Sequence, residues 1–251
     1  MSLWFSFVVG TILGSFYNVA GLRLPKGEPI FFARSRCSGC RRALSWHELV
    51  PVVSFFLLQG RCRKCGCKLS WLYPFVEAAT GCLFSLIVFV FHSDGSVLFG
   101  LLVVSLLAIV FVSDLTYMII PNRVLLVFLL IFVSSKSFGL LSAAFPLSWT
   151  GALTGFLVPM AAAWLSSGKI GGGDVKLLTL LGFMLGLPGV LTTLFFACLS
   201  GLLYSCVRIG IGWMKNDEPI AFGPFIALGA VICLFCGKPL LSLYFSLYER
   251  F

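Results

Sequence analysis

Four cysteines have the spacing of a metal site. Cys37 and Cys40 form one Cys-x-x-Cys pair, and Cys62 and Cys65 form a second pair after 21 intervening residues. Two turns of this kind can converge on one tetrahedral Zn²⁺. Four thiolates close the coordination sphere, so the pattern predicts a structural zinc site without metal catalysis. Two disulfides or four free thiols are the alternative, and Cys67 adds a fifth thiol nearby.

Two aspartates border long apolar stretches. Asp114 ends one of them, and Asp174 follows the glycines Gly171, Gly172 and Gly173. Two predicted membrane crossings separate them, so both belong at the same membrane boundary on different helices. Carboxyl groups that meet there tend to share one proton. One can then activate a water while the other polarises a carbonyl, which is the chemistry of aspartic proteases.

Each of these features also has a simpler explanation. An aspartate at a membrane boundary is often a helix cap or the partner of a base, and Lys176 lies two residues after Asp174. Gly171 and Gly173 would admit an extended peptide backbone, or they simply form a flexible turn. Glu77 begins the second apolar stretch, where we favour a helix-dipole charge over a contact with a basic substrate.

The composition shows which elements must position these groups. Hydrophobic residues make up 59% of the 251 residues, charged residues only 11%, and mean hydropathy is +1.05. Soluble domains carry about 25% charged residues, so we expect an all-α polytopic membrane protein. Disorder, collagen and a secreted disulfide scaffold are excluded. A span needs about 20 apolar residues, and about eight are expected, at roughly 2–22, 75–92, 97–114, 123–138, 140–165, 175–187, 189–210 and 219–236. The sixth is short, and seven spans are the alternative if the chain does not break at residues 187–189.

Charge predicts the orientation of the spans. Ten of the 18 bases lie within residues 23–68, which contain only two acids. In a membrane protein such a loop is more often cytosolic than nucleic-acid binding, and it can contact anionic lipid. With the N-terminus outside, 15 bases fall on the inner side and three on the outer side. No base precedes the first apolar run, so we expect a retained span and no signal peptide.

Three parts of the chain follow from these patterns. Residues 1–22 form the first transmembrane helix, 23–74 a cytosolic cysteine-rich loop, and 75–251 the transmembrane core. The loop is too small to build its own hydrophobic core, so zinc would stabilise it. A reducing cytosol disfavours disulfides there.

The ordered motifs resemble the type IV prepilin leader peptidases, membrane aspartic proteases of the GxGD class. The resemblance spans about residues 14–230. It is carried by Gly14-Ser15-Phe16-Tyr17-Asn18-Val19, Arg23-Leu24-Pro25, the two cysteine pairs, Gly60-Arg61-Cys62, Tyr73-Pro74-Phe75-Val76-Glu77, Asp114 with Ile119-Ile120-Pro121-Asn122, Gly171-Gly172-Gly173-Asp174-Val175-Lys176-Leu177 and Phe222-Gly223-Pro224-Phe225.

The resemblance implies an aspartic endopeptidase with Asp114 and Asp174 as catalytic residues. Its substrates would be type IV prepilins or competence and secretion pseudopilins, and it would cleave their short basic leaders at the cytosolic face of the bacterial inner membrane. Many members also N-methylate the new N-terminus with S-adenosylmethionine. The alternatives are a methyltransferase with a vestigial protease, a zinc-stabilised transporter or assembly factor without protease activity, and a presenilin-type protease. We expect no nucleic-acid partner.

Overall fold

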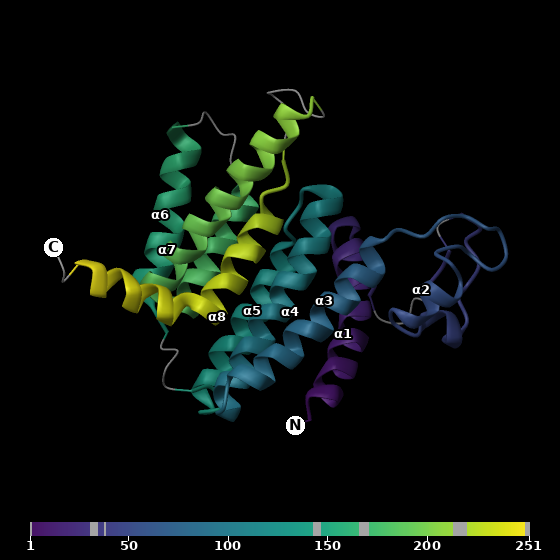
Figure 1. Ribbon diagram of the computed structural model, residues 1–251, viewed down its shortest axis with the longest axis horizontal. Helices are drawn as coiled ribbons and strands as arrows, with labels where there is room; N and C mark the ends of the chain where they lie inside the picture. Colours follow the sequence, from purple (N-terminus) through teal and green to yellow (C-terminus); the bar gives the residue numbers. More distant parts are fainter. Residues whose placement is uncertain are drawn as a thin grey trace.

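The computed structural model describes residues 2–30, 35–37, 39–142, 147–165, 171–212 and 220–248. The long elements in these residues are all helices: α1 (Leu3–Arg23), α3 (Leu72–Val90), α4 (Asp94–Tyr117), α5 (Asn122–Ser137), α6 (Trp149–Leu165), α7 (Gly172–Gly210) and α8 (Gly223–Tyr248). They lie side by side in a bundle, and the segment around the short α2 (Val53–Leu57) projects beside α1 and α3 (Figure 1). The all-α prediction is confirmed.

The 39-residue helix α7 is not one straight rod. Gly186 has φ 78° and ψ 177°, a conformation open to glycine, and Pro188 follows it. A straight helix would place Asp174 and Gly201 about 40 Å apart. Gly201 nevertheless packs against Phe222 and Phe225 beside the start of α8, near Asp174 and Asp114. The helix therefore folds back at Gly186, close to the break predicted at residues 187–189.

Membrane-spanning character follows from the length and composition of the helices. Among the described residues, four stretches are long and apolar enough to cross a membrane: Leu3–Lys26, Leu72–Val90, Asp94–Tyr117 and Gly172–Gly210. Two shorter apolar helices cover Trp149–Leu165 and Gly223–Gly237. If the two arms of α7 are counted separately, the described helical segments correspond to the eight predicted spans. The protein is a polytopic membrane protein.

One predicted span begins later than expected. In the stretch expected at residues 140–165, helix α6 begins at Trp149. Gly139 has φ +69°, which ends α5, and the Ser148 hydroxyl accepts a hydrogen bond from the Gly151 backbone N–H at 3.1 Å. Ser148 thereby acts as a cap for α6. Hydropathy alone did not reveal these local signals.

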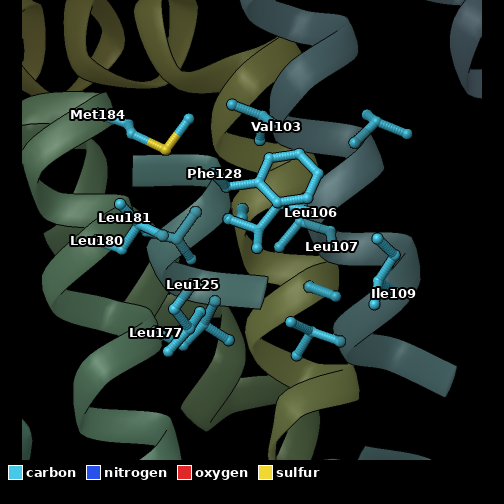
Figure 2. Packing of buried hydrophobic residues seen from close by; sticks show 14 of the residues in the cluster. Val103, Leu106, Leu107, Ile109, Leu125, Phe128, Leu177, Leu180, Leu181 and Met184 are labelled. Carbon is cyan, nitrogen blue, oxygen red and sulfur yellow. The ribbon is translucent and has the colours of Figure 1, made fainter. Parts of the chain in front are cut away.

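Apolar side chains from α4, α5 and α7 fill the centre of the bundle (Figure 2). Val103, Leu106, Leu107 and Ile109 come from α4, Leu125 and Phe128 from α5, and Leu177, Leu180, Leu181 and Met184 from the first arm of α7. This packing joins α4, α5 and the first arm of α7, so α5 links the two helices that carry the aspartates.

Small residues bring neighbouring helices into backbone contact. In a membrane, such contacts replace the hydrophobic driving force available in water. A Cβ added at Gly10 of α1 would lie 2.8 Å from the Gly81 Cα of α3. A Cβ at Gly155 of α6 would collide with the backbone oxygen of Leu178 in α7. Glycine is thus required at these crossings.

We expect Gly155→Ala to destabilise the protein by about 1–3 kcal/mol, because α6 must move away from α7 to accommodate the methyl group. Gly210→Ala is the matched control, since nothing lies within 4 Å of a Cβ there. In a helix the control should be neutral or stabilising by up to about 1 kcal/mol. Thermal unfolding in detergent measures both. Equal unfolding temperatures for Gly155→Ala and the wild type would contradict the close crossing.

Candidate functional site

Asp114 lies in the last turn of α4 and is only 5% exposed. Its Oδ2 accepts a hydrogen bond of 2.7 Å from the backbone N–H of Gly223, the first residue of α8. Free N–H groups and the positive dipole end of a helix N-terminus stabilise a nearby carboxylate. A Cβ at Gly223 would lie 2.7 Å from that Oδ2, so the contact depends on glycine. The start of α8 thus fixes the position of the Asp114 carboxyl group.

Asp174 is the third residue of α7 and is 9% exposed. Its carboxyl group lies close enough to that of Asp114 for the two to interact electrostatically. A Cβ at Gly171 would be 3.2 Å from Asp174 Oδ2, so glycine leaves this oxygen uncrowded. The fold therefore places two buried carboxyl groups from different helices within electrostatic range of each other at one end of the bundle.

The turn after α4 packs directly against the start of α7. The Ser113 hydroxyl donates to the Ile119 carbonyl within this turn. A Cβ at Gly173 would lie 3.1 Å from the Ile120 Cβ, so this glycine permits close packing of α7 on the turn. Lys176 Nζ donates to Asn122 Oδ1 at 3.0 Å. These contacts fix the position of the start of α7 against the turn that follows α4.

Lys176 therefore contacts the turn after α4 in this structure and is not the ion-pair partner of Asp174. In the described part of the chain, the ion pair joins Arg42 Nη2 to Glu48 Oε1 at 2.6 Å, away from Asp174 in the cysteine-rich loop. Within the described residues, the Asp174 carboxyl group at the start of α7 forms no salt bridge.

Glu77 lies apart from the two aspartates. It is in the second turn of α3, and its Oε2 accepts a hydrogen bond of 2.7 Å from the Val52 N–H. The helix-dipole interpretation is wrong, because the first turn of α3 carries no acid. Glu77 instead ties the cysteine-rich loop to the bundle, and its side chain lines a cavity between them.

The four predicted cysteines come together. The Sγ atoms of Cys37, Cys40, Cys62 and Cys65 all lie within 4.8 Å of one another. Matching backbone hydrogen bonds build the two turns: Cys37 N–H donates to the Arg42 carbonyl, and Cys62 N–H donates to the Cys67 carbonyl, both at 2.9 Å. The isolated bridges Arg36–Ala43 and Arg61–Lys68 flank these turns. The donor set fits one metal ion that prefers thiolates.

Backbone N–H groups prepare two of these thiols to bind a cation. Those of Cys65 and Lys64 lower the pKa of Cys62 to about 6. The pKa of Cys37 is also lowered, most strongly by the Cys40 backbone N–H. The Cys67 thiol and then the Gly39 backbone N–H add smaller effects. A lowered pKa favours the thiolate, which is the form that binds metal.

Cys67 supplies a fifth thiol at the edge of the cluster. Its Sγ lies 3.3 Å from that of Cys37. In the same loop, the Arg42–Glu48 ion pair is reinforced by the Ser45 N–H, which donates to Glu48 Oε2 at 2.9 Å. The guanidinium of Arg42 and this N–H lower the pKa of Glu48 to about 2. The ion pair thus fixes the segment that follows the first cysteine turn.

Gly223 is the residue whose role the sequence did not reveal. A Gly-Pro pair opening an apolar stretch signals a helix start. Nothing local, however, indicates that its N–H meets a carboxylate 109 residues earlier. Contacts of this kind depend on how α8 packs against α4.

Comparison with known proteins places these features in a family. A model described as the bacterial peptidase A24 N-terminal domain matches residues 8–91, and one described as the type IV leader peptidase family matches residues 101–206. A prepilin leader peptidase/N-methyltransferase of Bacillus subtilis (strain 168) is 36% identical over 96% of this chain and 97% of its own length.

Two further relatives carry the same name. The Burkholderia pseudomallei (strain K96243) protein is 30% identical over 95% of this chain and 87% of its own length. The Klebsiella pneumoniae protein is 36% identical over 78% of this chain and 91% of its own length. No solved structure matches the chain. With family models over both halves and relatives aligned over nearly its whole length, the chain belongs to the type IV leader peptidase family.

Proposed function

We propose that this protein is a membrane aspartic endopeptidase that removes the short basic leader of type IV prepilins or of competence and secretion pseudopilins. The juxtaposition of Asp114 and Asp174 at one end of the bundle carries the proposal. The names of its relatives support prepilins as substrates. They do not favour the alternative of a transporter or assembly factor.

The two carboxyl groups would share one proton and hold a water between them. One carboxylate accepts a proton from the water as its oxygen attacks the peptide carbonyl. The other carboxyl group donates its proton to the carbonyl oxygen. Collapse of the tetrahedral intermediate breaks the C–N bond, and the leaving amine takes the proton that the first carboxylate accepted from the water. The second carboxylate regains its proton from the hydroxyl group as the new carboxyl group forms. The N–H of Gly223 keeps Asp114 in place during these steps.

The glycines before Asp174 would admit the substrate backbone. Gly172 has open space where a Cβ would lie, and Gly171 adjoins Asp174 Oδ2. An extended peptide can approach such a segment closely. The precursor's hydrophobic segment would lie in the bilayer beside the spans, with its leader at the aspartate end of the bundle.

The cysteine cluster would hold Zn²⁺ through Cys37, Cys40, Cys62 and Cys65. Zinc would stabilise the loop of residues 23–74, which lies beside residues 1–22 and the peptidase core of residues 75–251. A four-thiolate site has no open coordination position, so its contribution is structural. S-adenosylmethionine would serve a second activity, N-methylation of the new N-terminus. The word N-methyltransferase in the names of the relatives supports a methylating activity.

We place the protein in the bacterial cytoplasmic membrane with the aspartate end facing the cytosol. The excess of bases in the loop before α3 supports this orientation. The basic loop would also contact anionic lipid headgroups.

A processing assay tests the proposal. Purified protein in lipid would receive a pilin-type precursor with a basic, Gly-ending leader, and mass spectrometry would locate the cut. We expect one cleavage after the leader glycine. An intact precursor, with folded and metal-loaded protein, would refute the peptidase proposal for this substrate class.

We expect Gly223→Ala to lower cleavage about tenfold to a hundredfold, because its Cβ would displace the Asp114 carboxyl group. Gly201→Ala is the matched control at the same end of the bundle, where a Cβ meets only ordinary contacts at 3.7 Å. Initial cleavage rates measure both variants. If both cleave at the wild-type rate, Gly223 does not position Asp114.

A further inference from the structure

An apolar groove of about 210 Å³ lies over α4, between α3 and α8. Both of these helices pack on α4. Among the described residues that line the groove, Thr80 is the only one with a polar side chain, and its hydroxyl donates to the Val76 carbonyl of its own helix at 2.7 Å. The groove is also smaller than the roughly 300–1,000 Å³ of small-molecule sites. It therefore suits apolar side chains better than a polar ligand or a cofactor.

The groove begins at the aspartate pair. On α4 it is lined by Leu107 and Phe111, and the same helical spacing of three or four residues leads on to Asp114. On α8 it begins at Pro224, the neighbour of Gly223, whose N–H holds the Asp114 carboxyl group. Asp114 thus lies at one end of the helix faces that form the groove.

The groove is open along its side. Phe75, at its aspartate end, is 60% exposed, and Leu228, on its rim, is 47% exposed. On α8 its lining extends from residue 224 to residue 231, which is about 10 Å of helix. Beyond that length the rings of Phe91 and Phe235 meet, with 6.2 Å between their centroids, and join the far end of α3 to α8. An apolar helix can therefore enter from the side and lie with its first turns beside Asp114.

We propose that this groove binds the start of the precursor's hydrophobic segment, and that Ala79, Ala108 and Ala227 determine which segments fit. The inference rests on the proposed peptidase function and assigns its substrate a place in the bundle. A chain cut at the aspartate pair must continue into the bilayer from that point, where the groove begins. Helices pack most closely where the facing residues are small, and each of the three helices contributes one of these alanines to the groove.

A second apolar groove, of about 390 Å³, provides the comparison. It is lined mainly by α6 and the second arm of α7, and Leu178 is the described residue that the aspartate-bearing first arm contributes. Ala162 lines this groove and is partly buried, as Ala108 is in the first groove. Lipid chains would fill both grooves, whereas the precursor is expected in the first groove alone.

Photo-crosslinking of the full-length, metal-loaded protein in lipid tests the proposal. The probe is a pilin-type precursor with one benzoylphenylalanine in the first turns of its hydrophobic segment, and mass spectrometry locates the residues to which it attaches. We expect attachment to α3, α4 and α8 at the groove. Ala108→Phe fills the groove and should lower this attachment about tenfold or more. The matched control, Ala162→Phe, should leave it unchanged.

Cleavage kinetics provide a second measurement. Filling the groove removes binding that precedes the chemical step, so Ala108→Phe should raise KM and leave kcat nearly unchanged. A truncated precursor that has the same leader but lacks the hydrophobic segment should be cleaved equally by Ala108→Phe and the wild type. That substrate distinguishes a blocked groove from a disturbed aspartate pair.

A milder variant guards against misfolding. Leu228→Ala trims an exposed side chain at the rim of the groove and should weaken precursor attachment about threefold or more. Leu202→Ala is its control, because Leu202 is an exposed residue of the second groove. Unfolding temperature and metal content verify that each variant folds.

The outcomes separate this inference from the peptidase function. Attachment at the second groove, or attachment that the folded groove variants leave undiminished, would overturn the docking site. Attachment at the first groove without cleavage would support the docking site and refute the peptidase proposal. Cleavage with attachment elsewhere would do the reverse.

Discussion

Replacing either aspartate of the pair by asparagine is expected to reduce precursor cleavage by about a thousandfold or more. An asparagine side chain at either position would keep the shape of the site but could neither take a proton from water nor share one with its partner. Acid–base catalysis by one group contributes about 10²–10⁴-fold, and loss of one member disables the pair. The double variant should therefore be scarcely slower than either single variant.

Single-turnover cleavage in lipid would measure Asp114→Asn, Asp174→Asn and the double variant. Asp94→Asn is the matched control, since Asp94 begins α4, at the opposite end of the helix from Asp114. It should cleave at the wild-type rate. A single-aspartate variant with undiminished cleavage would remove that residue from the catalytic role, and additive losses would argue against a shared proton.

The sequence predicts what is encoded locally. Hydropathy and length place the helical segments, the two Cys-x-x-Cys turns place the cysteines, and Asp114 and Asp174 fall at helix ends because each borders an apolar stretch. The prediction that Asp114 and Asp174 lie at the same membrane boundary depended on the number of membrane spans between them. The reversal of α7 at Gly186 leaves that argument intact, because it lies after Asp174.

What could not be predicted depends on contacts between distant segments. The Gly223–Asp114 hydrogen bond spans 109 residues, and the Glu77–Val52 bond joins a span to the loop. Lys176 could have paired with Asp174, two residues away, but it reaches Asn122 on the turn after α4. Sequence spacing indicates which nearby residues a polar side chain could contact. The packing of the helices determines which of them it does contact.

Removing the metal is expected to unfold the cysteine-rich loop while leaving the helix bundle intact. The loop has a short helix, two isolated bridges and few buried apolar residues, so metal–thiolate bonds would take the place of a hydrophobic core. Structural zinc sites of this kind contribute about 10–16 kcal/mol of apparent binding free energy at pH 7. Cys62→Ser removes one ligand and should therefore lose the metal and open residues 35–71 to proteases. Metal analysis and limited proteolysis would measure both effects.

The control for this prediction is Cys198→Ser, because Cys198 is exposed and lies on the second arm of α7. It should keep one metal ion per chain. Cys67→Ser tests the fifth thiol, and we expect it to retain the metal, since the other four sulfurs already converge. Ligand thiols must be deprotonated to bind a metal, so acidification should favour metal release. Full metal content in Cys62→Ser would exclude this thiol as a ligand and point to Cys67, whose sulfur is 3.3 Å from Cys37, as the substitute.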